Sequence, residues 1–121
     1  MGVKRCLSWR EVLKEHKTLR GIGQNSLLVD RGESGYNNRF LPGGVILYPG
    51  EGLSGHQQPV GGNRRLLVAL STQHPMQVFL REGVNCWRAL GPYRVAAVDY
   101  VWEEGERRFV YWFRLEPLTG G

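Results

Sequence analysis

Two tyrosines in the glycine-rich middle of the chain have neighbours that could bind a nucleobase. Tyr36 and Tyr48 are twelve positions apart, and small or polar residues adjoin both. A flat base can stack between two aromatic rings, which contributes about 1–3 kcal/mol, while nearby polar groups contact its Watson–Crick edge. The residues of this candidate base pocket are Tyr36, Asn37, Asn38, Arg39, Tyr48, Pro49 and Gly50. The residue types alone leave the alternative that both tyrosines are ordinary structural residues of a β-rich domain.

The net charge of the chain would suit a polyanionic partner. Sixteen Lys and Arg residues oppose eleven Asp and Glu residues, which gives a formal net charge of +5 at pH 7. A basic surface attracts nucleic acid, but basic patches also occur on proteins with no anionic partner. Charge therefore favours nucleic-acid binding without requiring it.

Several classes of site are absent from the sequence. Cys6 and Cys86 are the only cysteines, and their spacing does not resemble a metal site, so we expect a reduced thiol pair. No apolar run approaches the roughly 18 residues that span a bilayer, and the N-terminus lacks the apolar stretch of a secretory signal. We therefore expect a cytoplasmic protein with no metal, no cofactor and no membrane partner.

Short strands are expected to position the tyrosines. Apolar runs of strand length, each bounded by Gly, Pro or Asn, occur at 26–29, 45–48, 66–70 and 77–80. The clearest β pattern is the alternation over 108–115, which predicts a hairpin with 93–102. The polar turn between them contains Gly105, which we expect at a position with positive φ.

A short helix should precede these strands, because Ser8 and Glu11 have the spacing of a capping box and apolar residues follow at helical intervals from about 9 to 17. The length of 121 residues suits one domain, with 1–20 as helix and lead-in and 21–115 as the β-rich body. We predict a mainly β (α+β) fold built as a closed or nearly closed twisted barrel, because closure removes exposed strand edges. The glycine-rich loops between 21 and 65 would carry the site.

Motifs along 21–115 resemble, in order, those of the SRA (SET- and RING-associated, YDG) domain, the reader of modified cytosine in hemimethylated DNA and in modification-dependent restriction enzymes. That family sandwiches a flipped base between a Tyr in a G-Y-x-x-D type turn and a second Tyr twelve positions later, the spacing of Gly35-Tyr36 and Tyr48-Pro49-Gly50. Leu53-Ser54-Gly55 matches the family's L-S-G. The segments that resemble its N-R-A-L-A-L strand, its P-V-R-V strand, its R-Y-D-G-x-Y-x-V signature and its closing hairpin strand are 63–70, 75–78, 88–95 and 109–115.

The resemblance implies a diverged prokaryotic member of the type found in restriction systems, with a PUA-like, SRA-like barrel and a nucleoid-associated location. Its expected partner is double-stranded DNA carrying 5-methylcytosine, 5-hydroxymethylcytosine or a related modified pyrimidine. The expected action is base flipping, without catalysis. The chain could be a fragment of a longer protein, as the targeting domain of a modification-dependent nuclease, or could act with a partner protein.

The sequence departs from the family at the base pocket. The family Asp that accepts a hydrogen bond from the cytosine amine corresponds to Arg39, which can only donate. Either Asn37 or Asn38 takes over, or the pocket prefers an acceptor-rich base such as a hydroxylated or glycosylated pyrimidine, or Arg39 contacts a phosphate. The Tyr and Asp of the Y-D-G signature are replaced by Ala89 and Leu90.

The segments expected to contact DNA outside the pocket also differ. The loop over 55–62 is short and lacks the family's Asn-Lys-Arg finger, so His56, Gln57 and Gln58 could fill the gap left by the flipped base or form a solvated turn. Leu19 lies where the family has a minor-groove thumb and is the candidate apolar wedge. The candidate phosphate contacts, each of which could instead be an exposed charge, are Lys17, Arg20, Arg31, Arg64, Arg65 and Arg88.

Other functions remain as alternatives. A base-flipping DNA glycosylase would need a general base, and the pocket segments offer Glu33 and Glu51 as carboxylates. A zinc deaminase is excluded because its ligand pattern is absent. PUA-like barrels also bind RNA, and a phosphorothioate-DNA reader would need an apolar patch beside basic residues. We expect a binding module, not an enzyme.

Overall fold

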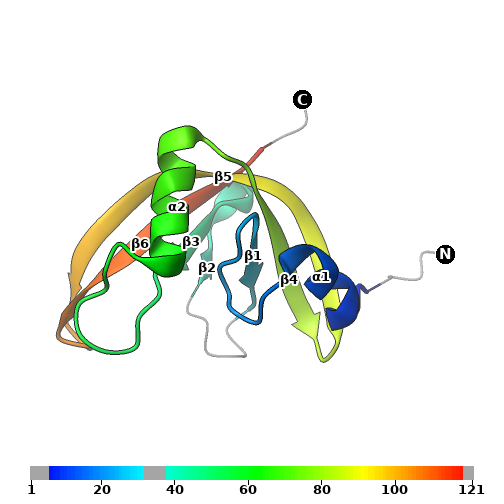
Figure 1. The fold of residues 1–121 in the computed structure, drawn as a ribbon, viewed down its shortest axis with the longest axis horizontal. Helices are drawn as coiled ribbons and strands as arrows, with labels where there is room; N and C mark the ends of the chain where they lie inside the picture. The colour runs from blue at the N-terminus through cyan, green and yellow to red at the C-terminus, as the bar shows by residue number, and fades with distance from the viewer. Residues whose placement is uncertain (1–5, 32–37, 119–121) are drawn as a thin grey trace.

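One six-stranded sheet is the main element of the computed structural model, which describes residues 6–31 and 38–118 (Figure 1). The strand order is β1-β4-β5-β6-β3-β2, and every neighbouring pair is antiparallel except β1 and β4, which are parallel. The strands are β1 (Ser26–Val29), β2 (Arg39–Phe40), β3 (Ile46–Pro49), β4 (Met76–Gly83), β5 (Cys86–Glu103) and β6 (Arg108–Pro117). The three-residue 3-10 turn η1 (Pro42–Gly44) connects β2 to β3.

The predicted strands at 26–29, 45–48 and 77–80 are confirmed as β1, β3 and β4, with shifts at the ends. The predicted hairpin is confirmed as β5 and β6. Its left-handed residue, however, is Arg107 (φ 53°), and Gly105 has no positive φ. The N–H groups of Glu106 and Arg107 both donate to the Glu103 carbonyl, which makes a helix-like turn whose left-handed residue falls at its end.

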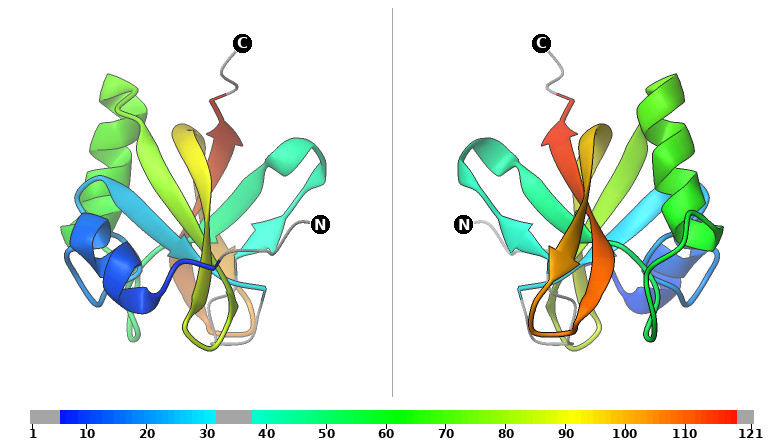
Figure 2. Two further views of the ribbon diagram at one scale, coloured as in Figure 1. Left: turned by 90° about the vertical axis from the view of Figure 1, so that its right-hand side faces the viewer. Right: turned by 90° about the vertical axis from the view of Figure 1, so that its left-hand side faces the viewer.

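The predicted mainly β (α+β) fold is confirmed. The sheet curves strongly but does not close, so the predicted barrel describes it only loosely (Figure 2). β1 and β2 are the two edges of the sheet. Register shifts at 78/79 and 81/83 in the β4–β5 pair, and at 95/97 in the β5–β6 pair, mark irregularities where long strands bend. The long strand β5 arches across the molecule, and the longer helix crosses in front of this arch in the view of Figure 1.

That helix, α2 (Gly61–Thr72), corrects the prediction of a strand at 66–70. Gly62, Leu66 and Ala69 are buried and lie on one face at helical spacing, so the helix packs this face against the sheet. A five-residue apolar run fits a strand or a helix equally well when read by itself. The spacing of the buried residues from Gly62 to Ala69, however, is that of one face of a helix.

The predicted N-terminal helix is confirmed as α1 (Trp9–His16). The Ser8 hydroxyl accepts from the Glu11 N–H at 3.2 Å, and the Glu11 carboxylate accepts from the Ser8 N–H at 3.0 Å, which completes the capping box. Lys17 ends the helix with a left-handed backbone (φ 62°). Within the described ranges, neither helix is long and apolar enough to cross a membrane.

Two hydrophobic clusters lie on opposite faces of β1. Leu27 and Val29 belong to the main core between the sheet and α2, whereas Leu28 packs with Val12 of α1 and with Trp87. Alternate residues of a strand point to opposite faces, so β1 is buried on both sides. α1 is thereby fixed to the sheet through a small core of its own.

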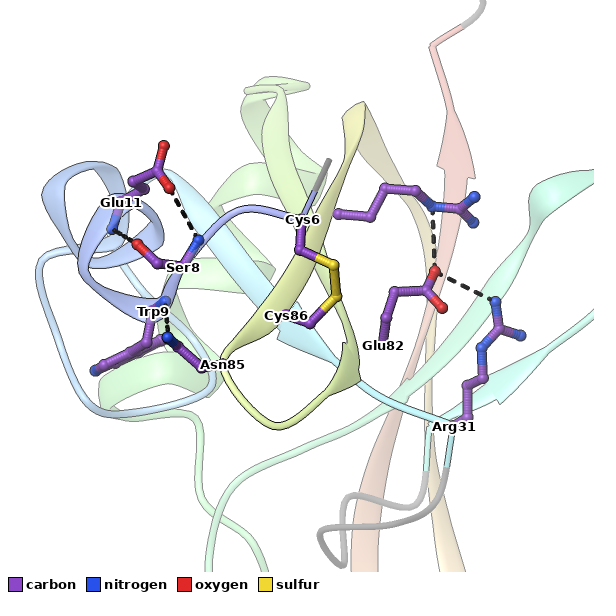
Figure 3. The surroundings of a disulfide bond; sticks show 9 residues. Cys6, Ser8, Trp9, Glu11, Arg31, Glu82, Asn85 and Cys86 are labelled. Carbon is purple, nitrogen blue, oxygen red and sulfur yellow. Dashed lines mark hydrogen bonds and ion pairs between the residues drawn. A yellow bond between two sulfur atoms is a disulfide. The ribbon is translucent and has the colours of Figure 1, made fainter. Parts of the chain in front are cut away.

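Cys6 and Cys86 form a disulfide, which corrects the prediction of a reduced thiol pair (Figure 3). Their Cα atoms are 4.8 Å apart although the residues are 80 positions apart in sequence. Leu7 and Trp87 exchange two backbone hydrogen bonds of 2.8 Å, which brings the neighbouring cysteines together. This long-range pairing could not be read from the cysteine spacing.

Candidate nucleic-acid interface

A cleft of about 720 Å³ lies between the loop after β3, the lead-in after α1 and the end of the β5–β6 hairpin. We call it the main cleft. Tyr48, Pro49 and Gly50 of the predicted base pocket line it, together with Arg20 of the predicted phosphate contacts. Two segments that the sequence linked only through the predicted function therefore meet at one cleft.

Hydrogen bonds from side chains fix the backbone that lines this cleft. The buried Gln57 donates from Nε2 to the Gly50 carbonyl at 3.0 Å, and its Oε1 accepts from the Tyr111 N–H at 2.8 Å. A Cβ at position 50 would overlap the Gln57 amide. The backbone of Glu51 is bound on both sides by Asn63, through bonds of 2.7 and 2.9 Å. Because Gln57 is engaged in this way, we leave it out of the proposed DNA contacts.

Tyr48 lies in the main core with only 2% of its surface exposed, although it is one of the residues that line the main cleft. Its hydroxyl donates to the Leu28 carbonyl at 3.1 Å. Tyr36 and Asn37, the other predicted members of this part of the pocket, lie outside the described residues. The facing pair of tyrosine rings therefore stays a prediction.

Asn38 forms hydrogen bonds with the backbone at the end of β1. Its Nδ2 donates to the Asp30 carbonyl at 2.8 Å, and its Oδ1 accepts from the Asp30 N–H at 3.2 Å. Arg39 lies in β2 with its guanidinium 5.4 Å from the centre of the Trp112 ring, a cation–π contact. Arg39 lines a separate groove with Asp99 and is not among the residues that line the main cleft.

A smaller cleft of about 290 Å³ gathers three of the predicted phosphate contacts, Lys17, Arg20 and Arg65. We call it the basic cleft. The N-terminus of α2 also lines it, and the amide groups of a helix N-terminus favour negative charge. Arg20 and Glu51 line both clefts, so the basic cleft adjoins the main cleft.

The other predicted phosphate contacts lie elsewhere. Arg31 approaches the Glu82 carboxylate at 3.6 Å (Figure 3). Arg88 approaches the same carboxylate at 3.3 Å. Arg64 lines a groove along α2 with Val68 and lines neither of the two clefts described above. The structure thus separates the six basic candidates into a group of three at one cleft and three others.

The remaining predicted contacts occupy two different places. Leu19 is 78% exposed and lines a groove with Trp9, not the main cleft. The Nδ1 of His56 accepts from the Phe109 N–H at 3.0 Å, so its ring lies against the hairpin. Gln58 is exposed beside it.

His16 positions the backbone of Arg20, a role that the sequence did not reveal. It is buried, its Nε2 lies 2.6 Å from the Arg20 carbonyl oxygen, and its Nδ1 lies 2.6 Å from the Ser26 hydroxyl. A carbonyl can only accept, so Nε2 carries the hydrogen and Nδ1 accepts from Ser26 in the neutral ring. Burial lowers the pKa of His16, although the bond to Arg20 acts in the opposite direction.

We expect this pKa shift to make the fold less stable in mild acid. Because the folded pKa is lowered, the unfolded chain takes up the proton first, so the free energy of unfolding falls as pH drops through the ordinary value of 6.5. Urea unfolding of wild type and His16→Gln at pH 7.5 and pH 5.5 measures the effect. The difference between the two pH values should shrink in the variant, and an equal difference in both proteins would contradict the role of His16.

Comparisons with known proteins give both a family and a fold. Residues 17–120 match the family model "ScoMcrA-like, SRA domain". The SUVH5 SRA domain bound to fully hydroxymethylated CG DNA matches with a TM-score of 0.78 and 22% identity, over 97% of this chain and 88% of that one. The SUVH5 SRA complex with hemi methylated CG DNA matches with a TM-score of 0.77 and 21% identity, over 99% and 92%. No curated protein matches the sequence.

The modification-dependent restriction endonuclease TagI matches with a TM-score of 0.76 and 22% identity, over 95% of this chain but 49% of TagI. In three further SUVH5 SRA complexes with methylated DNA the match covers 64% of that chain. These structural likenesses show the fold, which is that of an SRA domain.

Proposed function

Because this chain belongs to the ScoMcrA-like SRA domain family, we propose that it binds double-stranded DNA and flips a modified base into the main cleft. The observation that carries the proposal is that Arg20 lines both the main cleft, with Tyr48, and the basic cleft, with Lys17 and Arg65. A base reader needs a pocket for the base directly beside contacts that hold the DNA backbone in register. The adjoining main and basic clefts would meet this requirement.

The relatives support the chemical class of the ligand. SRA domains of this fold are bound to methylated and hydroxymethylated CG DNA, and TagI is a modification-dependent endonuclease. We infer that this chain reads 5-methylcytosine, 5-hydroxymethylcytosine or a related modified pyrimidine. As a binding module it would direct a nuclease, in the same chain or a partner, to modified DNA.

Base binding would require a rearrangement at Tyr48. The ring is almost closed off from solvent, so stacking on a flipped base needs the cleft to open. Tyr36 would then supply the second ring of the sandwich. Arg39 lies over Trp112 but is not among the residues that line the main cleft, and we assign it to the DNA backbone instead of the base.

The experiment measures binding to four duplexes that differ at one position: cytosine, 5-methylcytosine, 5-hydroxymethylcytosine and its glucosylated form. Wild type should bind at least one modified duplex about tenfold more tightly than plain DNA, since one base contact contributes about 1–3 kcal/mol. Arg39→Ala should weaken binding to all four alike, because a phosphate contact carries no base preference. A changed order of preference would place Arg39 at the base.

Two added measurements separate the alternative functions. An RNA duplex of the same sequence should compete poorly, and equal competition would point to RNA binding. Release of free base, with Glu51→Gln as the control variant, would identify a glycosylase. Equal affinity for plain and modified DNA would overturn the proposed reader.

A further inference from the structure

One edge of β5 has no neighbouring strand near the end of the strand. β4 pairs with β5 only as far as Tyr93, and the Gln73 side chain after α2 donates to the Val95 carbonyl at 3.4 Å. Beyond that point, within the described residues, β6 is the only strand that pairs with β5. We call residues 97–103 of β5 the open edge. An unpaired edge of this kind is a template for the addition of another strand.

The backbone groups of Tyr100 and Trp102 point toward the open edge. On β6, the N–H and C=O groups of Phe109 and Tyr111 form hydrogen bonds of 2.8 to 3.0 Å with the loop over 50–57, so they point away from β5. In an antiparallel pair, the residue opposite such an outward residue also points outward. Trp102 is opposite Phe109 and Tyr100 is opposite Tyr111, so each has an outward N–H and C=O.

The side chains of the open edge are exposed on both faces of the strand. Tyr100 and Trp102 are each 46% exposed, and Val101, which points to the opposite face, is also exposed. The Tyr100 hydroxyl donates to the Gln57 carbonyl at 2.9 Å, and the Trp102 Nε1 donates to the Glu104 carboxylate at 2.8 Å. The two rings are therefore held in place with apolar surface facing solvent. Exposed apolar side chains that lie together mark an interaction site, whereas scattered ones do not.

The charge of this part of the chain is opposite to that of the whole. The stretch 95–106 contains four carboxylates and no Lys or Arg, although the chain has a net charge of +5. Only one of the four, Glu106, forms an ion pair within the described residues, with Arg108 at 2.6 Å. Carboxylates repel a phosphate backbone and attract Lys and Arg side chains. The charge therefore favours a basic protein segment over DNA at the open edge.

We propose that the open edge binds an extended segment of a partner protein that carries Lys or Arg side chains and adds to β5 as a further strand. The outward backbone groups of Tyr100 and Trp102 supply its main-chain hydrogen bonds, and contacts with alternate side chains supply specificity. Its cationic side chains lie beside carboxylates and aromatic rings, both of which attract cations. This inference goes beyond base reading, because strand addition at the open edge needs no DNA.

The probe is a synthetic peptide of alternating lysine and valine, whose charge and β propensity suit the open edge. Wild type should bind it about tenfold more tightly than a peptide of alternating glutamate and valine of the same length. A lysine peptide with proline in place of each valine should bind no better than the glutamate peptide, because proline has no N–H to donate. Amide exchange at Tyr100 and Trp102 should slow when the lysine-valine peptide is added, since both N–H groups gain an acceptor.

Variants of the open edge test the same contact. Trp102→Thr should bind the lysine-valine peptide about tenfold more weakly, because it removes an exposed ring from the contact. Trp102→Pro should weaken binding about tenfold further, because it also removes an outward N–H while the bonds between β5 and β6 remain. Asp99→Asn should cost about threefold. Two matched controls, Val84→Ser (88% exposed) and Glu15→Gln on α1, should bind as wild type does. The exchange measurement on wild type holds even if a variant does not fold.

Three results would overturn the proposal. Equal affinity for the lysine and glutamate peptides, or unchanged exchange at Tyr100 and Trp102 in the presence of the lysine-valine peptide, would show that no basic strand adds to this edge. Slowed exchange that depends on protein concentration alone would assign the open edge to a second copy of the chain. Slowed exchange with DNA and not with the peptide would assign it to DNA. Because the peptide titration contains no DNA, its result is independent of the proposed base reading.

Discussion

The triple variant Lys17→Ala, Arg20→Ala and Arg65→Ala is expected to lose about a thousandfold in affinity for modified DNA at physiological salt. Each residue lines the basic cleft beside the N-terminus of α2. A hydrogen bond from a charged group contributes about 1.5–3 kcal/mol, which is roughly tenfold or more for each contact. The slope of log affinity against log salt should become shallower by about three, since each lost phosphate contact removes about 0.9.

A second triple variant separates these contacts from net charge. Arg31→Ala, Arg88→Ala and Arg94→Ala also removes three positive charges, but these arginines pair with Glu82 or Glu116. Its salt slope should stay close to that of wild type. Titration of both variants against one duplex at several salt concentrations gives the comparison, and similar losses in both would contradict a localised backbone site.

The ratio of affinities for modified and plain DNA should survive in the first triple variant. Phosphate contacts set the register of the protein on the duplex and carry no base information directly. A loss of discrimination would mean that one of the three residues reaches the base. Arg20 is the one to test singly in that event, because it lines both clefts.

The strands were predictable wherever the pattern was local. Alternation of side chains identifies the β5–β6 hairpin, and the Ser8–Glu11 spacing identifies α1. The run at 66–70 forms a helix although its sequence favours a strand, because five apolar residues carry no period of their own. The open edges of the sheet depend on pairing between distant segments, which a one-dimensional pattern does not contain.

The candidate site stays a prediction, although 48–50 lines the main cleft, and individual roles were not predictable. Gln57 looked like a polar contact, yet its amide bonds the backbone of Tyr111, 54 positions away. Arg31 and Arg88 are candidate phosphate contacts by sequence, yet both pair with Glu82. No sequence signal indicates that Arg108 donates hydrogen bonds to the Gly52 and Gly55 carbonyls. The type of a polar residue shows which hydrogen bonds it can form, whereas the fold determines which partner it has.

Replacing both cysteines, as Cys6→Ala with Cys86→Ala, is expected to lower the free energy of unfolding by about 2–4 kcal/mol. The bond closes a loop across a sequence separation of 80, and without it the unfolded chain gains conformational freedom. The folded state should survive, because Leu7 and Trp87 still exchange two backbone hydrogen bonds and the cluster around Val12 remains buried. Urea unfolding of wild type and the double variant gives the difference.

Reductant supplies the internal control for this prediction. Adding it should destabilise wild type towards the value of the double variant and leave the double variant unchanged, because only wild type has a bond to break. Amide exchange should then rise first in α1, whose contacts with the sheet are few beyond its own small core. Equal stability of wild type with and without reductant, despite free thiols by mass measurement, would show that the Leu7–Trp87 pairing alone holds this end of the fold.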